Sequence, residues 1–595
     1  MNIFSINQTR VVRYLAILSF FLFFFISFLS IQIIDSDFWW HLASGKYIVE
    51  NHSLPESDPF NYTTENKPSD RQMYLLSGYW LSQVIFYKLF DIWGAKGIIL
   101  LRSLLLVLFL FFIFLTIRKQ RVSDLTALII TSMCFLTAKN YIGERPVLFT
   151  FFTFSVVVYL LEDFRMNRGR KAFLLIPLAV MVLSNMHLGY VICIMLSALY
   201  LAGEGVRLFL GNEKRKDLLK GFLAIFVITG ILSLFNPNGG VMLTGIFSFH
   251  DEVIQDISEF IPTFVLYQNK IVPMDYAYII SLVFSLLSLR YLKKMEFIHM
   301  LLIAAFTAMS FFAVRYVIFY MCISSYVIAR IIANLKEEKI LNRLVERLKD
   351  KEGIVYIVTL IFGVFLVFQA IPALARFEFK AETSHYVPEG AADFLSDHAI
   401  NGNMLNEDGF GGYLIWRLYP GKKVFIDTRK MELDVFNEYR ALVNLWEGPP
   451  QSWMDIIIKY NITHIVTSPL MLTGDIYPLV EYLFDSKEWI LVYADHLSLI
   501  YVSNNSENTS VIRQFTRDKN EGLKTIIVQA SAQAMQNPKN PYYLISLGKV
   551  FLKMGRLNDA EKAFKMAYER DSGNTELKYW TQQLEKYKKY KVKGR

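Results

Sequence analysis

The sequence predicts an all-α polytopic membrane domain, then a small extracytoplasmic α/β domain, then a C-terminal α-helical hairpin of the tetratricopeptide type. Three observations predict this order. Long apolar segments recur through the first 371 of the 595 residues, and the loops between them are alternately basic. Alternating apolar runs then follow, separated by turn signals, and the chain ends in a polar helical pattern. We therefore expect domains at residues 1–371, 372–510 and 511–595.

The membrane domain is predicted from hydropathy. The chain is 54% hydrophobic and 15% aromatic, with a mean hydropathy of +0.33. Runs such as LLLVLFLFFIFL from Leu104 and FLAIFVITGILSLF from Phe222 approach the length of a bilayer-spanning helix. We expect about eleven spans, which start near Val11, Ala95, Leu125, Val147, Ala172, Gly189, Gly221, Val272, Glu296, Tyr316 and Gly353.

The net charge of +9 is concentrated in short loops between apolar segments, a pattern that argues against nucleic-acid binding. Every second loop is basic, which predicts that these loops are cytoplasmic; they begin at Arg118, Arg165, Arg207, Arg290 and Lys336. The first apolar stretch is longer than a signal-peptide core, so we expect a retained helix with a cytoplasmic N-terminus. An odd number of spans then predicts a multi-pass membrane protein whose C-terminal domains lie on the outer, extracytoplasmic face.

The first outer loop, residues 35–76, contains seven acidic and three basic residues. HLASGKYIVE, from His41, predicts a short interfacial helix, and SGYWLSQVIFYKLFDIW, from Ser77, predicts a second amphipathic helix. Asp35 and Asp37 stand at the membrane boundary, where a carboxylate is either a helix cap or part of a functional site. Two further residues, Trp39 and Trp40, are expected to be aromatic-belt anchors.

The α/β domain is predicted from the apolar runs KKVFIDTR at Lys422, ITHIVTSP at Ile462 and WILVYADHLSLIYV at Trp489, with turn signals EDGFGGY and EGPPQ between them. We expect it to be a structural lid or, through Asp427 and Arg429, part of an acceptor site. Further on, the spacing of small and aromatic residues is that of one 34-residue tetratricopeptide hairpin: Leu547, Gly548, Phe551, Gly555, Ala560, Phe564 and Ala567. Such a hairpin either binds a protein partner or caps the α/β domain.

Charged and polar residues gather at the predicted outer ends of the helices. Besides Asp35 and Asp37 they are Lys139, Glu144, Arg145, Asn185, His187, His250, Asp251, Glu252, Asp256, Glu259 and Arg315. Charges at the bilayer edge on separate helices usually converge on one another or on a water-filled cavity. Structural alternatives remain for single residues, since a buried histidine can be a packing residue and Arg145 can pair with Glu144 or reach lipid headgroups. Arg315, flanked by apolar residues, is the hardest to explain structurally.

The stretch DSDFWWHLASGKYIVEN resembles the first outer loop of the GT-C glycosyltransferases, which include the oligosaccharyltransferases and the protein O-mannosyltransferases. Asp37 matches the acidic residue that follows the first span in that superfamily, and aromatic residues and His41 follow it. The likeness covers about 370 residues in architecture but only this motif in sequence. The WWDYG acceptor motif of oligosaccharyltransferases is absent, and Glu144 stands where a DxD pair is expected. With its terminal tetratricopeptide hairpin, the whole chain resembles a bacterial group of this superfamily.

The resemblance implies an enzyme that moves a sugar from a polyprenyl-phosphate donor to a glycan, lipid or protein acceptor, with inversion, on the outer face. Asp37 would be the general base, assisted by Asp35. Arg145 and Arg315 would bind the leaving phosphate, and the further candidates for substrate binding are His41, Lys139, Glu144, His187 and Glu259. No cofactor is certain; a divalent cation (Mg²⁺ or Mn²⁺) would be held by Asp35 and Asp37, or by Glu259.

Two other classes of function stay open on the sequence. A transporter or flippase for a lipid-linked glycan would have charges at the bilayer midplane and broken helices repeated in two halves, and neither is clear here. A non-catalytic membrane scaffold that displays its outer domains would leave the one-sided charges, Arg315 above all, without a purpose.

Overall fold

The computed structural model describes residues 6–64, 70–211, 215–241, 258–268, 272, 274–290, 295–337, 352–375, 387–447, 452–471 and 473–593. Four polar residues expected at the outer face (His250, Asp251, Glu252 and Asp256) lie outside these ranges, as does most of EGPPQ. The chain forms two compact units. Unit 1 comprises residues 1–35, 44–54 and 73–381, and unit 2 comprises residues 36–43, 55–72 and 382–595. Unit 2 is therefore assembled from pieces that lie far apart in the sequence.

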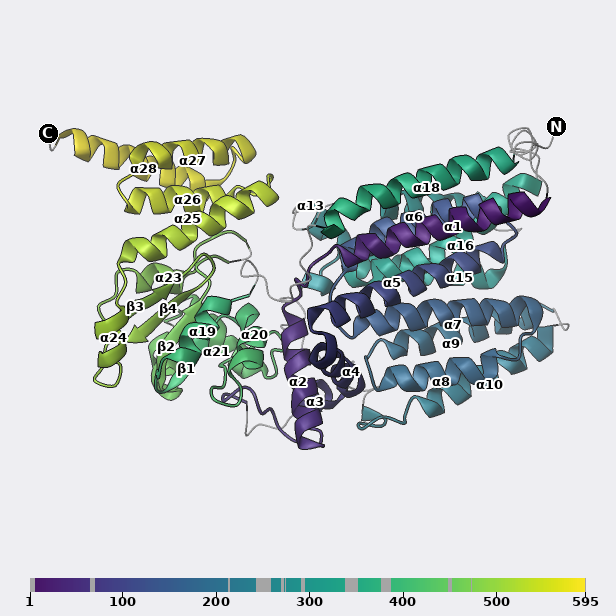
Figure 1. Cartoon of the computed structure of the whole chain (residues 1–595), viewed down its shortest axis with the longest axis horizontal. Coiled ribbons are helices and arrows are strands. Elements are labelled where there is room, and N and C mark those ends of the chain that lie inside the picture. Colours follow the sequence, from purple (N-terminus) through teal and green to yellow (C-terminus); the bar gives the residue numbers. More distant parts are fainter. Residues whose placement is uncertain are drawn as a thin grey trace. The chain divides into compact units, whose positions relative to one another are not determined.

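Unit 1 is a bundle of helices, shown in purple to teal in Figure 1. Its main helices are α1 (Ile6–Leu29), α4 (Trp80–Trp93), α5 (Ala95–Arg118), α6 (Asp124–Ala138), α7 (Val147–Asn167), α8 (Ala172–Ser184), α9 (Tyr190–Phe209), α10 (Lys216–Leu232), α14 (Tyr276–Leu287), α15 (Phe297–Phe312), α16 (Val317–Glu337) and α18 (Glu352–Ala375). Shorter elements between them are η1 (Lys139–Tyr141), η4 (Ser258–Phe260), α13 (Thr263–Gln268) and η6 (Val314–Tyr316). Two more, α2 (Asp37–Asn51) and α3 (Asp70–Ser77), contribute residues to both units.

A helix begins within five residues of each of the eleven expected span starts. Within the described ranges, six are long and apolar enough to cross a membrane by length and composition: Gln8–Leu29, Ala95–Arg118, Val147–Asn167, Tyr190–Phe209, Val314–Leu335 and Glu352–Leu374. The apolar helices α8, α14 and α15 are shorter. The prediction of a multi-pass membrane domain is therefore confirmed by the length and composition of the helices. The count of eleven spans stays a prediction.

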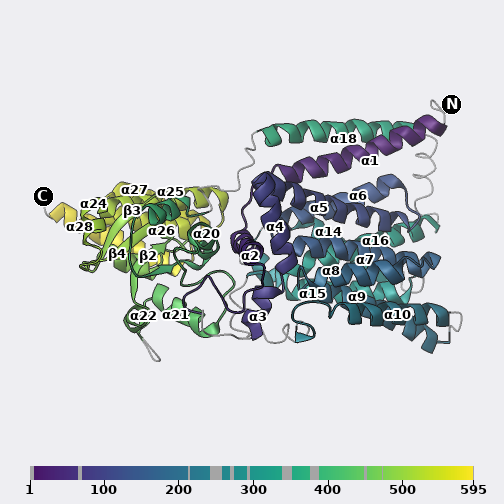
Figure 2. The ribbon, with the colours of Figure 1, turned by 60° about the horizontal axis from the view of Figure 1, so that its bottom comes forward.

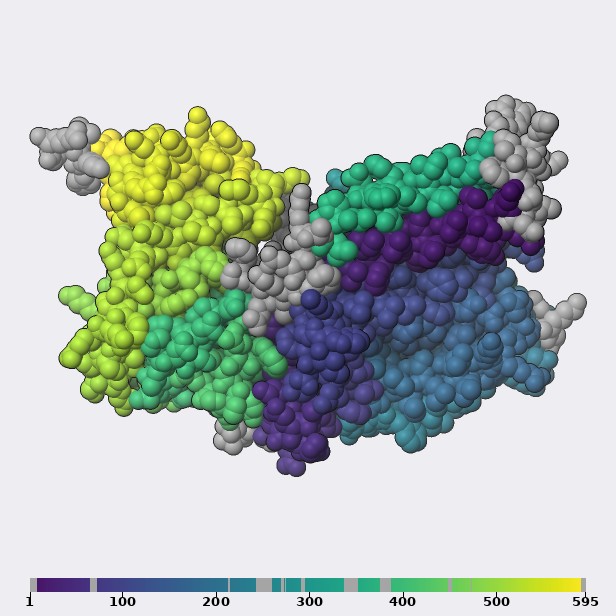
Figure 3. All heavy atoms as spheres, in the orientation of Figure 1, coloured from purple at the N-terminus to yellow at the C-terminus, as the bar shows by residue number. Residues whose placement is uncertain are grey.

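Helices α1 and α18, the first and last of the apolar helices, pack side by side (Figures 1 and 2). A Cβ at Gly363 of α18 would collide with Ser19 of α1, so a glycine allows this close approach. The rings of Phe20 and Phe362 lie 6.2 Å apart. Elsewhere both helices expose large apolar side chains, and they form a continuous surface in Figure 3. A surface of this composition is expected to face lipid.

A network of ion pairs joins the helices of unit 1 at the ends that border the basic loops. The Glu296 carboxylate, just before α15, pairs with Arg165 of α7 at 2.6 Å, Arg207 of α9 at 2.8 Å and Arg215 before α10 at 3.4 Å. Arg165 also pairs with the fully buried Glu162 at 2.7 Å. Three of the arginines expected at the cytoplasmic loops are therefore partnered within the protein.

Unit 2 contains a four-stranded mixed sheet in the order β1-β2-β4-β3, formed by β1 (Asn403–Asn406), β2 (Ile462–Thr467), β3 (Trp489–Ala494) and β4 (Leu499–Ser503). Strands β1 and β2 are parallel, while β2 with β4 and β4 with β3 are antiparallel. The helices of this part are α19 (Glu389–Asp397), α20 (Asp408–Leu418), α21 (Leu433–Val443), α22 (Trp453–Lys459) and α23 (Pro478–Leu483). The prediction of a small domain with mixed α and β structure is confirmed.

Two segments of this domain differ from the expectation. EDGFGGY, expected as a turn, forms the start of helix α20, because its glycines are used for close packing rather than for turning. A Cβ at Gly411 would collide with the backbone at Ile426 and Asp427. KKVFIDTR is also not a strand of the sheet; within it, Val424 forms an isolated parallel bridge with Asn61 of the first outer loop.

The chain ends in α24 (Thr509–Phe515), α25 (Lys519–Gln536), α26 (Tyr542–Lys553), α27 (Leu557–Arg570) and α28 (Thr575–Lys593). Helices α26 and α27 pack together, with no space for a Cβ between Gly548 and the Phe564 ring. The Ser546 hydroxyl donates to the Gly474 carbonyl at 2.7 Å, and the Asn540 amide donates to the Thr473 carbonyl at 2.9 Å. The hairpin therefore packs on the sheet domain, whereas its assignment as a tetratricopeptide repeat stays a prediction.

Candidate active site

The candidate residues divide between the two units. Asp37, the first residue of α2, belongs to unit 2 together with His41. Trp39 and Trp40 are 1% and 5% exposed, so the expectation that they anchor a membrane interface is wrong. They are buried in unit 2, where the Trp39 ring meets Tyr413 of α20 edge to face at 4.9 Å. This packing fixes the start of α2 against α20.

A glycine makes that contact possible. A Cβ at Gly412 would lie 2.8 Å from the Ser36 carbonyl oxygen and 3.4 Å from the Trp40 amide nitrogen. We expect Gly412→Ala to destabilise the protein by about 1–3 kcal/mol, because overpacking against backbone outweighs the gain in helix propensity of about 1 kcal/mol. Thermal unfolding of the purified protein measures this. Gly573→Ala, where a Cβ has only an ordinary contact at 3.4 Å, is the matched control; an equal midpoint for the two variants would contradict the expectation.

The first outer loop pairs with the segment that contains VFIDTR. The Val424 amide donates to the Phe60 carbonyl at 3.0 Å, and the Tyr62 amide donates to the Val424 carbonyl at 3.2 Å. On the other side, the Asn406 side chain at the end of β1 accepts from the Phe425 amide at 2.8 Å and donates to the Ile426 carbonyl at 2.7 Å. The segment is thus held between the outer loop and the sheet.

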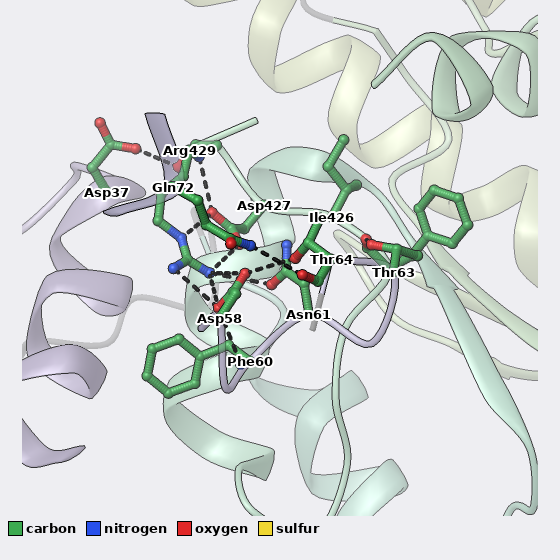
Figure 4. A network of polar contacts seen from close by, with 12 residues as sticks. Asp37, Asp58, Phe60, Asn61, Thr63, Thr64, Gln72, Ile426, Asp427 and Arg429 are labelled. Atoms are coloured by element: carbon green, nitrogen blue, oxygen red, sulfur yellow. Dashed lines mark hydrogen bonds and ion pairs between the residues drawn. The ribbon is translucent and has the colours of Figure 1, made fainter. Parts of the chain in front are cut away.

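Arg429 is the centre of a buried polar network (Figure 4). Its guanidinium binds both carboxylate oxygens of Asp427, at 2.7 and 2.6 Å, and donates to Asp58 at 3.3 Å and Asn61 at 3.2 Å. The Asp58 carboxylate also accepts from the Phe60 amide at 3.1 Å. Burial raises the pKa of Asp58, and the nearby Asp427 adds to this effect while Arg429 opposes it. Two carboxyl groups therefore share one buried cation.

Asp37 is connected to this segment through the residue between Asp427 and Arg429. The Thr428 hydroxyl donates a hydrogen bond to Oδ1 of Asp37 (Figure 4 shows the carboxylate). Asp37 is partly exposed, whereas Asp427 and Arg429 are buried. The carboxylate at the start of α2 is therefore accessible and is also bound by a neutral donor.

In unit 1, a second group of charges begins at Asp35. Asp35 pairs with Arg145 at 2.7 Å, and Arg145 also pairs with Glu259 of η4. Burial raises the pKa of the Glu259 carboxyl, but Arg145 and Arg315 outweigh it, so the pKa lies below its usual value. The Arg315 guanidinium lies 4.4 Å from the centre of the Phe260 ring. We name Asp35, Arg145, Glu259 and Arg315 the arginine cluster; Arg145 and Glu259 are about one-third exposed.

His187 lies beside the arginine cluster but carries no charge at neutral pH. Burial, with Arg315 and Arg145 nearby, lowers the pKa of His187 to about 3. Its Nδ1 accepts a hydrogen bond from the Gly189 amide at 2.9 Å and lies 2.7 Å from the Thr150 hydroxyl oxygen. Since Nδ1 accepts a hydrogen bond, the ring hydrogen is on Nε2. His187 can therefore donate a hydrogen bond to a ligand without adding positive charge.

Glu144 lies in the interior of unit 1, where it forms an ion pair with another helix. It is fully buried and paired with Arg102 of α5, which is also fully buried. Arg102 further donates to carbonyls at the end of α1, to Phe28 at 2.8 Å and to Ile31 at 2.5 Å. The pair thus completes the C-terminal turn of α1, where backbone carbonyls have no partner within the helix. This geometry gives Glu144 a role in joining helices rather than in contacting substrate.

Two groups of residues in these networks were not among the candidates predicted from the sequence. Arg102 could have been found, because it interrupts an apolar run just as Arg315 does. Asp58, Asn61 and Thr428 carry no such signal, since polar residues in a loop and after a strand-like run are common. Of the remaining candidates, His41 is buried against the Trp40 ring and Lys139 is exposed.

The described residues do not fit the expected divalent cation. They contain no group of three or more His, Cys, Asp or Glu side chains placed to hold a metal ion. Asp35 is bound by the guanidinium of Arg145, and Asp37 is bound by the hydroxyl of Thr428. The guanidinium of Arg145 and the hydroxyl of Thr428 compete with a metal ion for these carboxylate oxygens. The reaction proposed for this chain therefore includes no step at a metal ion.

Comparison with known proteins supports the fold. No protein-family model matches the chain, and no curated protein matches it in sequence. Among solved structures it is similar to the archaeal oligosaccharyltransferase AglB from Archaeoglobus fulgidus, in complex with an inhibitory peptide and a dolichol-phosphate. The TM-score is 0.58 at 10% sequence identity, over 92% of this chain and 87% of AglB.

Two further structures of an Archaeoglobus fulgidus oligosaccharyltransferase are similar to this chain. The apo form has a TM-score of 0.51 at 10% identity, over 83% of this chain and 75% of the enzyme. The form tethered through a disulfide bond to an acceptor peptide with the NVT sequon has a TM-score of 0.51 at 11% identity, over 84% and 74%. At these identities the likeness shows the fold. The resemblance to oligosaccharyltransferases that the first outer loop predicts is confirmed for the fold.

Proposed function

We propose that this chain, which has the fold of an oligosaccharyltransferase, is a membrane glycosyltransferase. It moves a sugar from a polyprenyl-phosphate donor to a hydroxyl or amide of a glycan, lipid or protein acceptor. The observation that carries the proposal is the position of Asp37 at the start of the first outer loop. Asp37 is the partly exposed first residue of α2 and accepts a hydrogen bond from the Thr428 hydroxyl, while Asp35, two residues earlier, is paired with Arg145.

These positions suit two different roles. A carboxylate paired with a guanidinium holds that guanidinium in place. A general base has to be reached by the acceptor, and Asp37 is partly exposed. We therefore assign Asp37 as the general base, and Asp35 as the residue that positions Arg145. The arginine cluster then begins two residues before the base in the chain.

The proposed reaction is a single displacement with inversion. The acceptor oxygen or nitrogen attacks the anomeric carbon while its proton moves to Asp37. The bond from the anomeric carbon to the phosphate oxygen breaks, and the polyprenyl phosphate leaves with one additional negative charge. Arg145 and Arg315 stabilise that charge, and His187 can donate one hydrogen bond from Nε2. We extend the proposal to eleven spans and to reaction on the periplasmic face of the inner membrane, which the alternately basic loops favour.

The test uses a deletion strain of the native host. Membranes of this strain retain the donor and the acceptor, and purified protein is added to them. We expect a defined glycan, missing from the deletion strain by mass spectrometry, to form together with free polyprenyl phosphate. Formation in the presence of EDTA would agree with the residues described above. If the deletion removes no glycan, the proposal fails; if lipid-linked glycan instead accumulates on one face, a flippase is the better explanation.

We expect Arg315→Gln to lower the initial rate about 10- to 100-fold, since a charge-assisted hydrogen bond contributes about 1.5–3 kcal/mol and Arg145 remains. The measurement is the initial rate of glycan formation in the membrane assay, per folded molecule. Arg170→Gln removes a charge from an exposed position in a basic loop and is the matched control. Equal rates for the two variants would remove Arg315 from the phosphate site.

A further inference from the structure

Thr428 is the residue that connects the candidate base to the buried network of unit 2. Its hydroxyl donates to Asp37, while the residues on either side of it bind each other. The Arg429 amide also donates to the Asp427 carboxylate at 2.9 Å. The backbone of Thr428 is thus placed by a tight turn that is closed through both main-chain and side-chain bonds.

The turn is itself held from three directions. Asp58 and Asn61 of the outer loop bind Arg429, and Asn406 binds the carbonyl of Ile426, directly before the turn. The Arg429 guanidinium lies 5.6 Å from the Trp40 ring centre and 5.3 Å from the Phe60 ring centre. A β-branched side chain on such a fixed backbone has few rotamers, so the direction of its hydroxyl is well defined.

We propose that Thr428 is a positioning residue for Asp37: its hydroxyl fixes the carboxylate in one orientation. The inference rests on the proposed function, because it assigns a purpose to this contact only if Asp37 is the base. The segment after the last membrane helix then contributes directly to the reaction.

The pH dependence of the reaction is the readout that separates positioning from a purely structural role. The titratable and charged groups on the elements packed against Asp37 in unit 2 are His41, Asp58, Glu407, Asp408, Asp427, Arg429 and Lys430. Burial and the neighbouring Asp408 raise the pKa of Glu407 to about 8. Its titration therefore falls in the alkaline range of the profile, away from the acid limb.

The experiment compares Thr428→Val, which keeps the shape but removes the hydroxyl, with Thr428→Ser, which keeps the hydroxyl. The initial rate of glycan formation is measured from pH 4 to pH 9 in membranes of the deletion strain. We expect Thr428→Val to lower the plateau rate about tenfold. Its acid limb should move to higher pH, because a carboxylate that loses a donor is ionised less readily. Thr428→Ser should restore both the plateau and the acid limb.

The outcomes separate the two proposals. An unchanged acid limb in Thr428→Val, with Asp37→Asn inactive, would overturn the positioning role and leave the proposed function intact. Full activity of Asp37→Asn would remove Asp37 as the base and overturn the positioning role with it, whereas the glycosyltransferase proposal itself fails only if deletion of the protein removes no glycan. If Thr428→Val does not fold, Thr428→Ala must show the same displaced acid limb, and an acid limb like that of the wild type would overturn the inference. A loss of rate in Thr428→Ser as large as in Thr428→Val would also do so, because the hydroxyl would then not matter.

Discussion

Asp37→Asn is expected to lower the rate of glycan formation by about 10²- to 10⁴-fold, the usual contribution of a general base. Asparagine has nearly the same shape and can still accept the hydrogen bond of the Thr428 hydroxyl, so the fold should be kept. What is lost is a group that takes up a proton from the acceptor. The measurement is the initial rate in membranes of the deletion strain, with equal amounts of folded protein.

The control for this experiment is Asp397→Asn, an exposed carboxylate at the end of α19 in the same unit. It should leave the rate unchanged within a factor of two or so, since exposed substitutions rarely matter. A rate for Asp37→Asn within about tenfold of the control would remove Asp37 as the base. Asp35→Asn should then be tested in its place, because it is the other carboxylate of the motif.

Arg429→Leu is expected to destabilise the protein by about 3–5 kcal/mol, because it leaves the buried carboxylates of Asp58 and Asp427 without their shared cation. It also removes the bonds that join the outer loop to the turn around Thr428. We expect early unfolding of unit 2, measured by thermal melting and by the protease sensitivity of the purified full chain in detergent.

Arg417→Leu is the matched control for that experiment. Arg417 pairs with Asp393 at 2.6 Å, but its side chain is 28% exposed and that of Asp393 is 52% exposed. A pair of this kind contributes at most about 1 kcal/mol. If the two arginine variants melt at the same temperature, the network around Arg429 does not stabilise unit 2 as described.

Much of the fold could be predicted from the sequence because a membrane imposes strong constraints. A helix in lipid must be apolar over its length and bond its own backbone, so hydropathy alone places the helices of unit 1 to within a few residues. Strand pairs such as β3 and β4, which are close in sequence, were also predictable. EDGFGGY was not, since glycines that open space for a neighbouring backbone look the same in sequence as glycines that turn a chain.

The candidate site was predictable only in part. Charges on separate apolar helices must find partners, which is why Arg145 and Glu259 were expected to converge and do pair. The contact between Asp58 and Arg429 joins residues 371 positions apart. Neither residue stands in an apolar run, so no local pattern marks them. A pairing of this kind depends on which loop reaches which domain, and that is a property of the tertiary structure.

The composition of unit 2 has a consequence for biosynthesis. Its residues 36–43 and 55–72 leave the ribosome early, but their partners follow only after residue 382, when all the apolar helices have been made. During that time Asp58 and Asn61 have no Arg429 to bind, and the outer loop has no Val424 to pair with. Unit 2 can therefore be completed only after synthesis of the membrane helices.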